Sequence, residues 1–177
     1  LLLNLMLETG SVEWPVSSVL CKLLTSGTIT VSGKRILEIG AGTALPSLTA
    51  VQLGAASVTI QDTADYRDPV KWACHLPSVP ILTGTWDHLL SQPPPPADLI
   101  LASDVFYERP CFPNCMAYIA HVLGPNFAAE AVVVFSERSV NYNVDPLLDA
   151  FGLFAEYMES QSADLHSFRV RIKTTSL

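Results

Sequence analysis

The sequence has few cysteines, few basic residues and no membrane-length apolar run, and each scarcity excludes a class of protein. Its four cysteines form no C-x-x-C pair, so neither a disulfide scaffold nor a metal site is indicated. Ten Lys and Arg against seventeen Asp and Glu give a formal charge of −7, which disfavours binding to a phosphate backbone. The apolar start, residues 1–7, is interrupted by Asn4 and is too short to span a bilayer. We therefore expect a cytoplasmic or nuclear protein with reduced thiols, without membrane or direct nucleic-acid binding.

What the sequence does contain is a strand, a glycine turn and a helix start in immediate succession. The apolar run 36–39 is typical of a buried strand, and Gly40 and Gly42 follow where that strand must turn. Pro46 suits the first turn of a helix that would end near Leu53. Because this arrangement exposes backbone N–H groups to a ligand, we expect a binding site here.

The residues of this turn favour a cationic ligand over a dinucleotide. A dinucleotide fingerprint, G-x-G-x-x-G, needs a third glycine where this chain has Leu45. Glu38, two residues before the first glycine, would repel a phosphate and suits a cation. The pattern E-x-G-x-G resembles the first motif of class I S-adenosylmethionine-dependent methyltransferases. An ordinary glycine turn with an exposed glutamate is the alternative.

Apolar strands alternate with helices along the rest of the chain. Asp62, at the end of the second strand, can accept hydrogen bonds from ribose hydroxyls, a device that NAD enzymes share. Helices are expected over 15–24, 46–53, 87–90, 112–123 and 147–151, and strands over 36–39, 57–61, 80–86, 98–104, 131–136, 154–159 and 166–173.

This alternation predicts an α/β fold with a Rossmann-like, seven-stranded, mostly parallel sheet, helices on both faces and an antiparallel C-terminal hairpin. We expect residues 1–177 to form a single domain, with 1–30 as an N-terminal extension and helix leading into the core. The segment 63–78 is short and polar where such a fold normally has a full helix.

Five collinear segments resemble methyltransferase family 16, the protein-lysine-methyltransferase-like group. They are VEWP (12–15), LEIGAGT (37–43), VTIQD (58–62), TWD (85–87) and LASDVFYE (101–108). The resemblance implies that the backbone at Gly40, Ala41 and Gly42 approaches the amino-acid moiety of S-adenosylmethionine, while Glu38 orders that loop and Asp62 holds the ribose. It also implies that Trp14 and Trp86 flank the cofactor, with Trp86 near the adenine, and that Ser103 lines the pocket.

The same resemblance assigns the acceptor side to a D-x-x-Y signature, Asp104 to Tyr107. Asp104 would orient a cationic side chain, and Tyr107 would form the wall of a narrow channel through cation–π contact. Glu137, after the fifth strand, would face the same end of the sheet and is a secondary candidate. The structural alternatives are a helix N-cap for Asp104, core packing for Tyr107 and the tryptophans, and an ion pair with Arg138 for Glu137.

These features predict an enzyme that transfers a methyl group from S-adenosylmethionine to a protein side-chain nitrogen, leaving S-adenosylhomocysteine. The broad family implies lysine, whereas its most similar branch implies arginine of a histone. We favour arginine, since Asp104 and Glu137 would give a guanidinium two acidic partners and the net negative charge would attract a histone or another basic protein.

We expect a monomer. Two rival functions remain. A methyltransferase-fold module without turnover is favoured by the thin 63–78 segment, and an NAD-binding oxidoreductase is disfavoured by Leu45 and Glu38.

Overall fold

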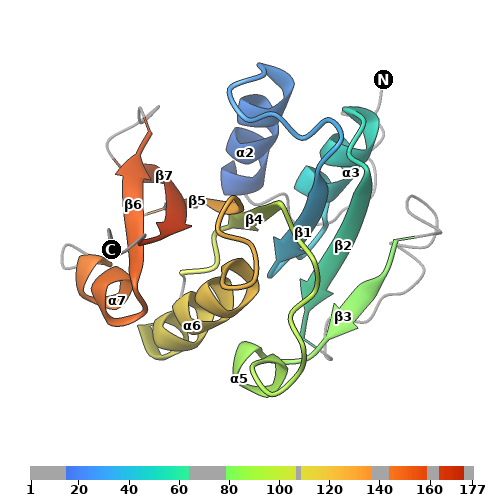
Figure 1. The fold of residues 1–177 in the computed structure, drawn as a ribbon. Coiled ribbons are helices and arrows are strands. Elements are labelled where there is room, and N and C mark those ends of the chain that lie inside the picture. Colours follow the sequence, from blue (N-terminus) through green and yellow to red (C-terminus); the bar gives the residue numbers. More distant parts are fainter. Residues whose placement is uncertain (1–14, 64–78, 107–108, 137–143, 159–163, 174–177) are drawn as a thin grey trace.

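The computed structural model describes residues 15–63, 79–106, 109–136, 144–158 and 164–173, which build one sheet flanked by helices (Figure 1). Its strands are β1 (Arg35–Ile39), β2 (Ser57–Asp62), β3 (Ile81–Thr83), β4 (Leu99–Ser103), β5 (Glu130–Ser136), β6 (Leu153–Tyr157) and β7 (Leu165–Ile172). Its helices are α2 (Pro15–Thr25), α3 (Leu45–Gln52), α5 (Trp86–Leu89), α6 (Phe112–Leu123) and α7 (Asp145–Ala150), with a 3-10 turn, η2, over Arg109–Cys111.

The strand order is β3-β2-β1-β4-β5-β7-β6. Strands β1 to β5 pair in parallel, and β7 pairs antiparallel with both β5 and β6. The predicted seven-stranded, mostly parallel sheet with its C-terminal hairpin is therefore confirmed. Because the chain leaves β1 toward β2 on one side and reaches β4 on the other, the β1–β4 boundary is the topological switch point of the sheet.

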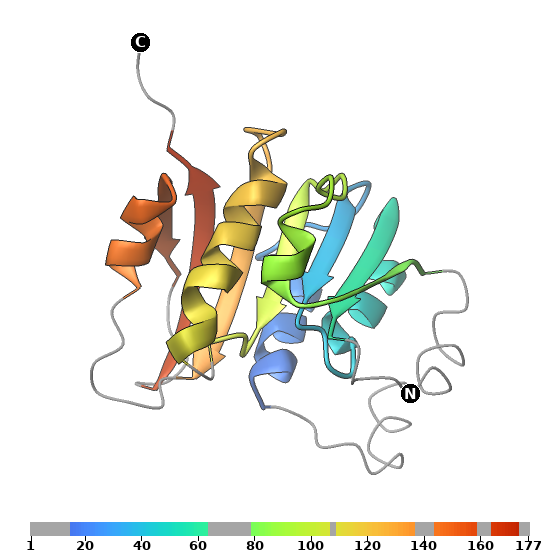
Figure 2. The same cartoon turned by 90° about the horizontal axis from the view of Figure 1, so that it is seen from below.

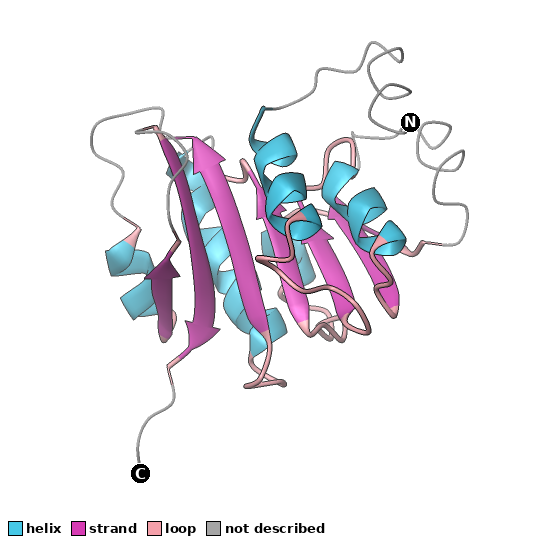
Figure 3. Ribbon diagram, turned by 90° about the horizontal axis from the view of Figure 1, so that it is seen from above, coloured by secondary structure: helices cyan, strands magenta, loops and turns pink. Residues whose placement is uncertain are grey.

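Side chains alternate between two cores because successive residues of a strand point to opposite faces. Leu37 and Ile39 of β1 belong to the core that α5, α6 and α7 cover, and Ile36 belongs to the core under α2 and α3. Figures 2 and 3 show these two helical layers on opposite faces of the sheet. The interior strand β5 is buried from Glu130 to Phe135, as its near-continuous apolar sequence requires.

Most predicted boundaries lie within one or two residues of the observed ones, and the end of the third strand differs most. The third strand ends at Thr83, not at Trp86, and Trp86 instead begins α5. Gly84, at a φ of 150°, turns the chain there, and its N–H donates to the carbonyl of Asp62 at 3.0 Å. The apolar start at 1–7 and residues 64–78 of the short polar segment lie outside the described residues. No described helix is long and apolar enough to cross a membrane.

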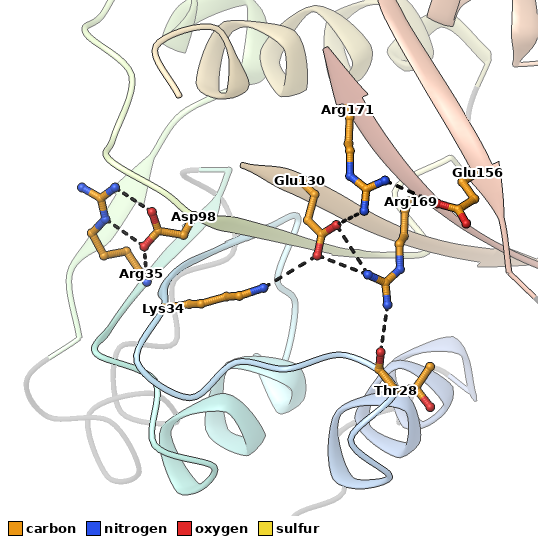
Figure 4. Close-up of polar contacts among 8 residues, drawn as sticks. All are labelled: Thr28, Lys34, Arg35, Asp98, Glu130, Glu156, Arg169 and Arg171. Carbon is orange, nitrogen blue, oxygen red and sulfur yellow. Dashed lines mark hydrogen bonds and ion pairs between the residues drawn. The ribbon is translucent and has the colours of Figure 1, made fainter. Parts of the chain in front are cut away.

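Acidic and basic side chains form ion pairs at the amino ends of the parallel strands, opposite the end where β1 turns into the glycine loop (Figure 4). Glu130 contacts Arg171 Nη2 at 2.7 Å, Arg169 Nη1 at 3.4 Å and Lys34 Nζ at 3.7 Å. Arg169 Nη2 also donates to the carbonyl of Thr28 at 2.8 Å, which links β7 to the loop before β1. These contacts join the antiparallel part of the sheet to its parallel part.

Candidate functional site

A cavity of about 340 Å³ opens at the carboxyl ends of β1, β2 and β4, beside the switch point of the sheet. Residues from the turn after β3 and from the beginning of α6 complete its wall. Open α/β sheets bind their ligands at this position, because the strand order diverges there and leaves a crevice.

The glycine turn after β1 lies at the cavity in a backbone conformation that needs glycine. Gly40 and Gly42 have φ values of 57° and 51°, in the left-handed region. An added Cβ at Gly40 would lie 2.9 Å from Val105 Cγ1, whereas a Cβ at Gly42 would meet nothing within 4 Å. Gly40, Ala41 and Gly42 all line the cavity. The expectation that their N–H groups are free for a ligand is wrong, because they donate to Gln61 Oε1, the Gln61 carbonyl and Asp62 Oδ2.

Glu38 lies beneath this turn and is not among the described residues that line the cavity. Its side chain is fully buried, and Oε2 accepts the backbone N–H of Ser47 at 2.7 Å. Ser47 lies in the first turn of α3, so Glu38 satisfies one of the donors that a helix start leaves unpaired. Burial raises the pKa of Glu38 to about 8, against the opposing effect of the Ser47 hydrogen bond.

This placement changes the interpretation of Glu38. The sequence suggested a carboxylate that faces a cationic ligand or orders the glycine loop, and the geometry supports the ordering role, through α3. The position of Glu38 also argues against binding of a dinucleotide. A pyrophosphate would need the N–H groups at the start of this helix, and the Glu38 side chain already occupies that position.

Asp62 is held at the edge of the cavity by backbone donors. Its Oδ2 accepts the N–H of Gly42 at 2.7 Å, and its Oδ1 accepts the N–H of Thr63 at 2.7 Å. A carboxylate has about four acceptor sites, so both oxygens can still accept hydroxyl groups of a ligand. The carboxylate of Asp62 thus ties β2 to the glycine turn and presents acceptors to the cavity.

Gln61, which our sequence interpretation did not select, joins more of the site than any predicted residue. Its Oε1 accepts the N–H of Gly40 at 3.2 Å and the indole Nε1–H of Trp86 at 2.8 Å. Its Nε2 donates to the carbonyl of Gly84 at 2.8 Å. The available signal was a long amide side chain in β2, immediately before Asp62.

The end of β4 forms the opposite wall. Ser103 is hydrogen-bonded to Ser17 of α2 through their hydroxyl oxygens, 2.9 Å apart, and both residues line the cavity. Asp104 follows with a φ of 56°, which is uncommon for a residue other than glycine. Its N–H donates to the carbonyl of Val134 at 2.8 Å, and its side chain is buried at the cavity. Such backbone strain is found most often at functional sites.

Three aspartates, Asp62, Asp87 and Asp104, line the cavity, and its described lining contains no lysine, arginine or histidine. A hydrogen bond from the Thr85 side chain lowers the pKa of Asp87 below its ordinary value. The cavity therefore favours cations and disfavours phosphate groups. Among the residues that the structure describes, no group of three His, Cys, Asp or Glu side chains is placed to hold a metal ion.

Most of the predicted site residues come together at this cavity. Those that line it are Gly40, Ala41, Gly42, Asp62, Trp86, Ser103 and Asp104. Trp14, Tyr107 and Glu137 lie outside the described residues, so their roles stay predictions. Ser17, Gln61, Asp87, Cys111 and Asn114 also line the cavity and were not predicted.

Comparison with known sequences identifies relatives. The sequence profile of the family described as lysine methyltransferase matches residues 5–145. The human histone-arginine methyltransferase METTL23 is 31% identical over 161 residues, which cover 85% of this chain and 83% of that protein. The mouse METTL23 is 29% identical over 165 residues, and the match covers 89% of this chain but only 65% of that protein. The zebrafish (Danio rerio) protein N-lysine methyltransferase METTL21A is 30% identical over 177 residues, covering 92% of this chain and 78% of that protein.

Solved structures share the fold at low sequence identity. The ribosomal protein L11 methylase from Lactobacillus delbrueckii superimposes with a TM-score of 0.69 at 15% identity, covering 93% of this chain and 82% of that one. The TehB-like SAM-dependent methyltransferase from Corynebacterium glutamicum does so with a TM-score of 0.65 at 17% identity, covering 98% of this chain and 94% of that one.

Proposed function

This chain belongs to the lysine methyltransferase family, and on that premise we propose that it transfers a methyl group from S-adenosylmethionine to a side-chain nitrogen of a protein. The observation that carries the proposal is the cavity at the switch point. It combines a glycine turn, the Asp62 carboxylate and an aspartate-rich lining without described basic residues. The matching family profile confirms the predicted resemblance.

The described residues fit this cofactor. Gly42 leaves open space where a side chain would project, so a ligand's amino-acid moiety can approach the main chain there. Asp62 offers acceptors for ribose hydroxyls, and Trp86 gives an aromatic surface in the same lining. The absence of a described basic side chain suits a ligand with a sulfonium and an ammonium group.

The rival NAD-binding function fits poorly. Its pyrophosphate would need the start of α3, where Glu38 accepts the N–H of Ser47, and the described lining has no cation to balance two phosphates. The other rival, a fold module without turnover, draws no support from the described site, since Asp104 remains strained and buried at the cavity beside Ser103.

On the acceptor side, we propose that Asp104 orients the nitrogen that receives the methyl group. When bound, S-adenosylmethionine would supply an electrophilic methyl group on its sulfonium; the acceptor nitrogen would gain this methyl group and lose a proton to solvent, and S-adenosylhomocysteine would leave as the neutral thioether. Most acceleration in such a reaction comes from alignment and electrostatics. Asp104 is suited to this task because its backbone N–H donates a hydrogen bond to the carbonyl of Val134, which fixes its main chain. Tyr107 and Glu137 are proposed as its partners.

For the acceptor we favour arginine over lysine, on a histone or another basic protein. A guanidinium keeps its charge at ordinary pH and needs carboxylates to hold it, and Asp104 and Asp87 both line the cavity. A lysine ammonium must first lose a proton, and the described lining has no histidine to accept it. Relatives carry both names, histone-arginine and protein N-lysine methyltransferase.

The deciding experiment measures transfer of a radiolabelled methyl group to paired basic peptides, in which every arginine or every lysine is replaced. We expect label to disappear with the arginine replacements only. Label that disappears with the lysine replacements only would overturn the choice of acceptor, and no transfer to any protein or peptide would support the module without turnover.

We further propose that residues 1–177 act as one methyltransferase domain, as a monomer, in the cytoplasm or nucleus and without nucleic acid as a partner. The sheet spans 35–172, and the cysteines that the structure describes, Cys21, Cys111 and Cys115, form no disulfide, which is compatible with a reducing compartment.

A further inference from the structure

The Gln61 side chain connects four segments of the site through one carboxamide. It lies in β2 and is only 1% exposed. From there it reaches Gly40 after β1, Gly84 after β3 and Trp86 at the start of α5. These partners are 21, 23 and 25 residues away in the sequence, so the contacts are tertiary.

The chemistry of the carboxamide explains why an amide occupies this position. Its oxygen accepts two N–H groups and its nitrogen donates to a carbonyl, so three partly buried polar groups are satisfied together. An apolar side chain in β2 would leave all three without these partners, which is costly away from water.

Trp86 and the glycine turn are also neighbours. The Trp86 Cζ2 atom lies 3.6 Å from the position that a Cβ on Gly40 would occupy, and both residues line the cavity. Gln61 therefore holds the Trp86 ring in a fixed orientation relative to the main chain at Gly40. A flat group of a ligand could lie between these two surfaces.

We propose that Gln61 is a positioning residue that locks Trp86 against the glycine turn before any ligand binds, so that the nucleoside end of the cavity is preformed. The identity of the ligand rests on the proposed function. A preformed wall improves affinity because the ligand does not have to order it. Gln61 acts on binding and not on the methyl-transfer step, since its contacts lie after β1, after β3 and at the start of α5.

The test compares Gln61→Met, which keeps the length of the side chain but loses the carboxamide, with the control Gln52→Met at an exposed position of α3. We expect Gln61→Met to weaken S-adenosylhomocysteine binding by about tenfold and to raise KM for S-adenosylmethionine with little change in kcat. The control should bind as the unsubstituted chain does. Unchanged affinity in a folded Gln61→Met variant overturns the proposal.

A fluorine NMR signal distinguishes positioning from general destabilisation. In protein labelled with 5-fluorotryptophan, the chain's three tryptophans give separate signals, and Trp86 is assigned by its loss in Trp86→Phe. We expect the Trp86 signal of ligand-free Gln61→Met to shift and broaden, and to sharpen when S-adenosylhomocysteine is added. A weakened affinity with an unchanged Trp86 signal would show that Gln61 does not act through Trp86.

If Gln61→Met does not fold, hydrogen exchange in the unsubstituted chain still tests the proposal. The hydrogen-bonded Trp86 indole N–H should exchange with solvent much more slowly than an exposed indole, without ligand. Exchange as fast as in free tryptophan overturns the preformed wall. This measurement needs no ligand, so failure of the unsubstituted chain to bind S-adenosylhomocysteine refutes the proposed function separately.

Discussion

Gly42 and Gly33 share a left-handed backbone, with φ values of 51° and 73°, and neither has an atom within 4 Å of an added Cβ. They differ in that Gly42 lines the cavity, whereas Gly33 does not belong to its described lining. Gly42→Ala and Gly33→Ala should therefore each cost about 1–2 kcal/mol of folding free energy from backbone strain. We expect only Gly42→Ala to abolish S-adenosylhomocysteine binding, measured by calorimetry. An equal loss of S-adenosylhomocysteine affinity in both variants would mean that Gly42 matters for folding alone.

Glu38 provides a pH dependence whose sign follows from burial. Its pKa is raised to about 8 in the folded chain, so the neutral form is favoured there. The stability that this group contributes is complete below the unfolded pKa of about 4.3 and is lost as pH rises through the folded value. Relative to Glu38→Gln, which cannot titrate but keeps an acceptor for Ser47, the chain should lose stability between about pH 5 and pH 9. Urea unfolding of both proteins across this range measures the difference, and parallel pH profiles would contradict the buried neutral carboxyl.

Asp104 allows an unusually clean substitution, because asparagine has the same shape and also tolerates a left-handed backbone. Asp104→Asn should keep the fold and the affinity for S-adenosylhomocysteine, and lower turnover by about a hundredfold. Methyl-transfer rates at saturating cofactor provide the measurement. If affinity and melting temperature fall together with the rate, the Asp104 carboxylate stabilises the chain turn after β4 and the acceptor group lies elsewhere.

At the scale of elements, α6 contains a buried hydroxyl, that of Tyr118, which has no hydrogen-bond partner among the residues that the structure describes. The Tyr118 side chain packs in the core, and burial raises its pKa to about 12. Tyr118→Phe, which removes the hydroxyl, should therefore leave the free energy of unfolding unchanged or raise it by up to about 1 kcal/mol. Tyr157→Phe on β6 is the control, since that exposed hydroxyl donates to Asp145 at 3.2 Å. Thermal unfolding compares the two, and a loss greater than about 1 kcal/mol in Tyr118→Phe would reveal a partner for the hydroxyl.

The elements differ in how well their boundaries could be predicted from the sequence. β1 and the start of α3 were predictable, because an apolar run, two glycines and Pro46 are local signals. The end of β3 was not, since it depends on Gly84 being bonded to Asp62 and Gln61 across the sheet. The same limit applies to the site. Asp62 and Asp104 stand in recognisable motifs at strand ends, whereas the role of Gln61 arises from tertiary contacts, and the direction of Glu38 toward α3 depends on how that helix packs.

At the scale of the whole molecule, charge is separated along the strands. The cavity at the carboxyl ends has three aspartates, while several basic residues at the amino ends are engaged by Glu130, Asp98 and Glu156 (Figure 4). Arg35 holds the pKa of Asp98 down to about 2 through a charge-assisted hydrogen bond. We therefore expect a cationic substrate to be attracted to the carboxyl edge, where Asp104 lies.

The central claim is that this cavity binds S-adenosylmethionine and not a dinucleotide. Calorimetric titration of the chain with S-adenosylmethionine, S-adenosylhomocysteine and NAD tests it most directly, with Asp62→Ala as the site variant. We predict binding of the first two ligands, none of NAD, and a loss of about 1–3 kcal/mol in Asp62→Ala from the missing hydrogen bonds to the ribose. Tight NAD binding without a response to S-adenosylmethionine would contradict the account.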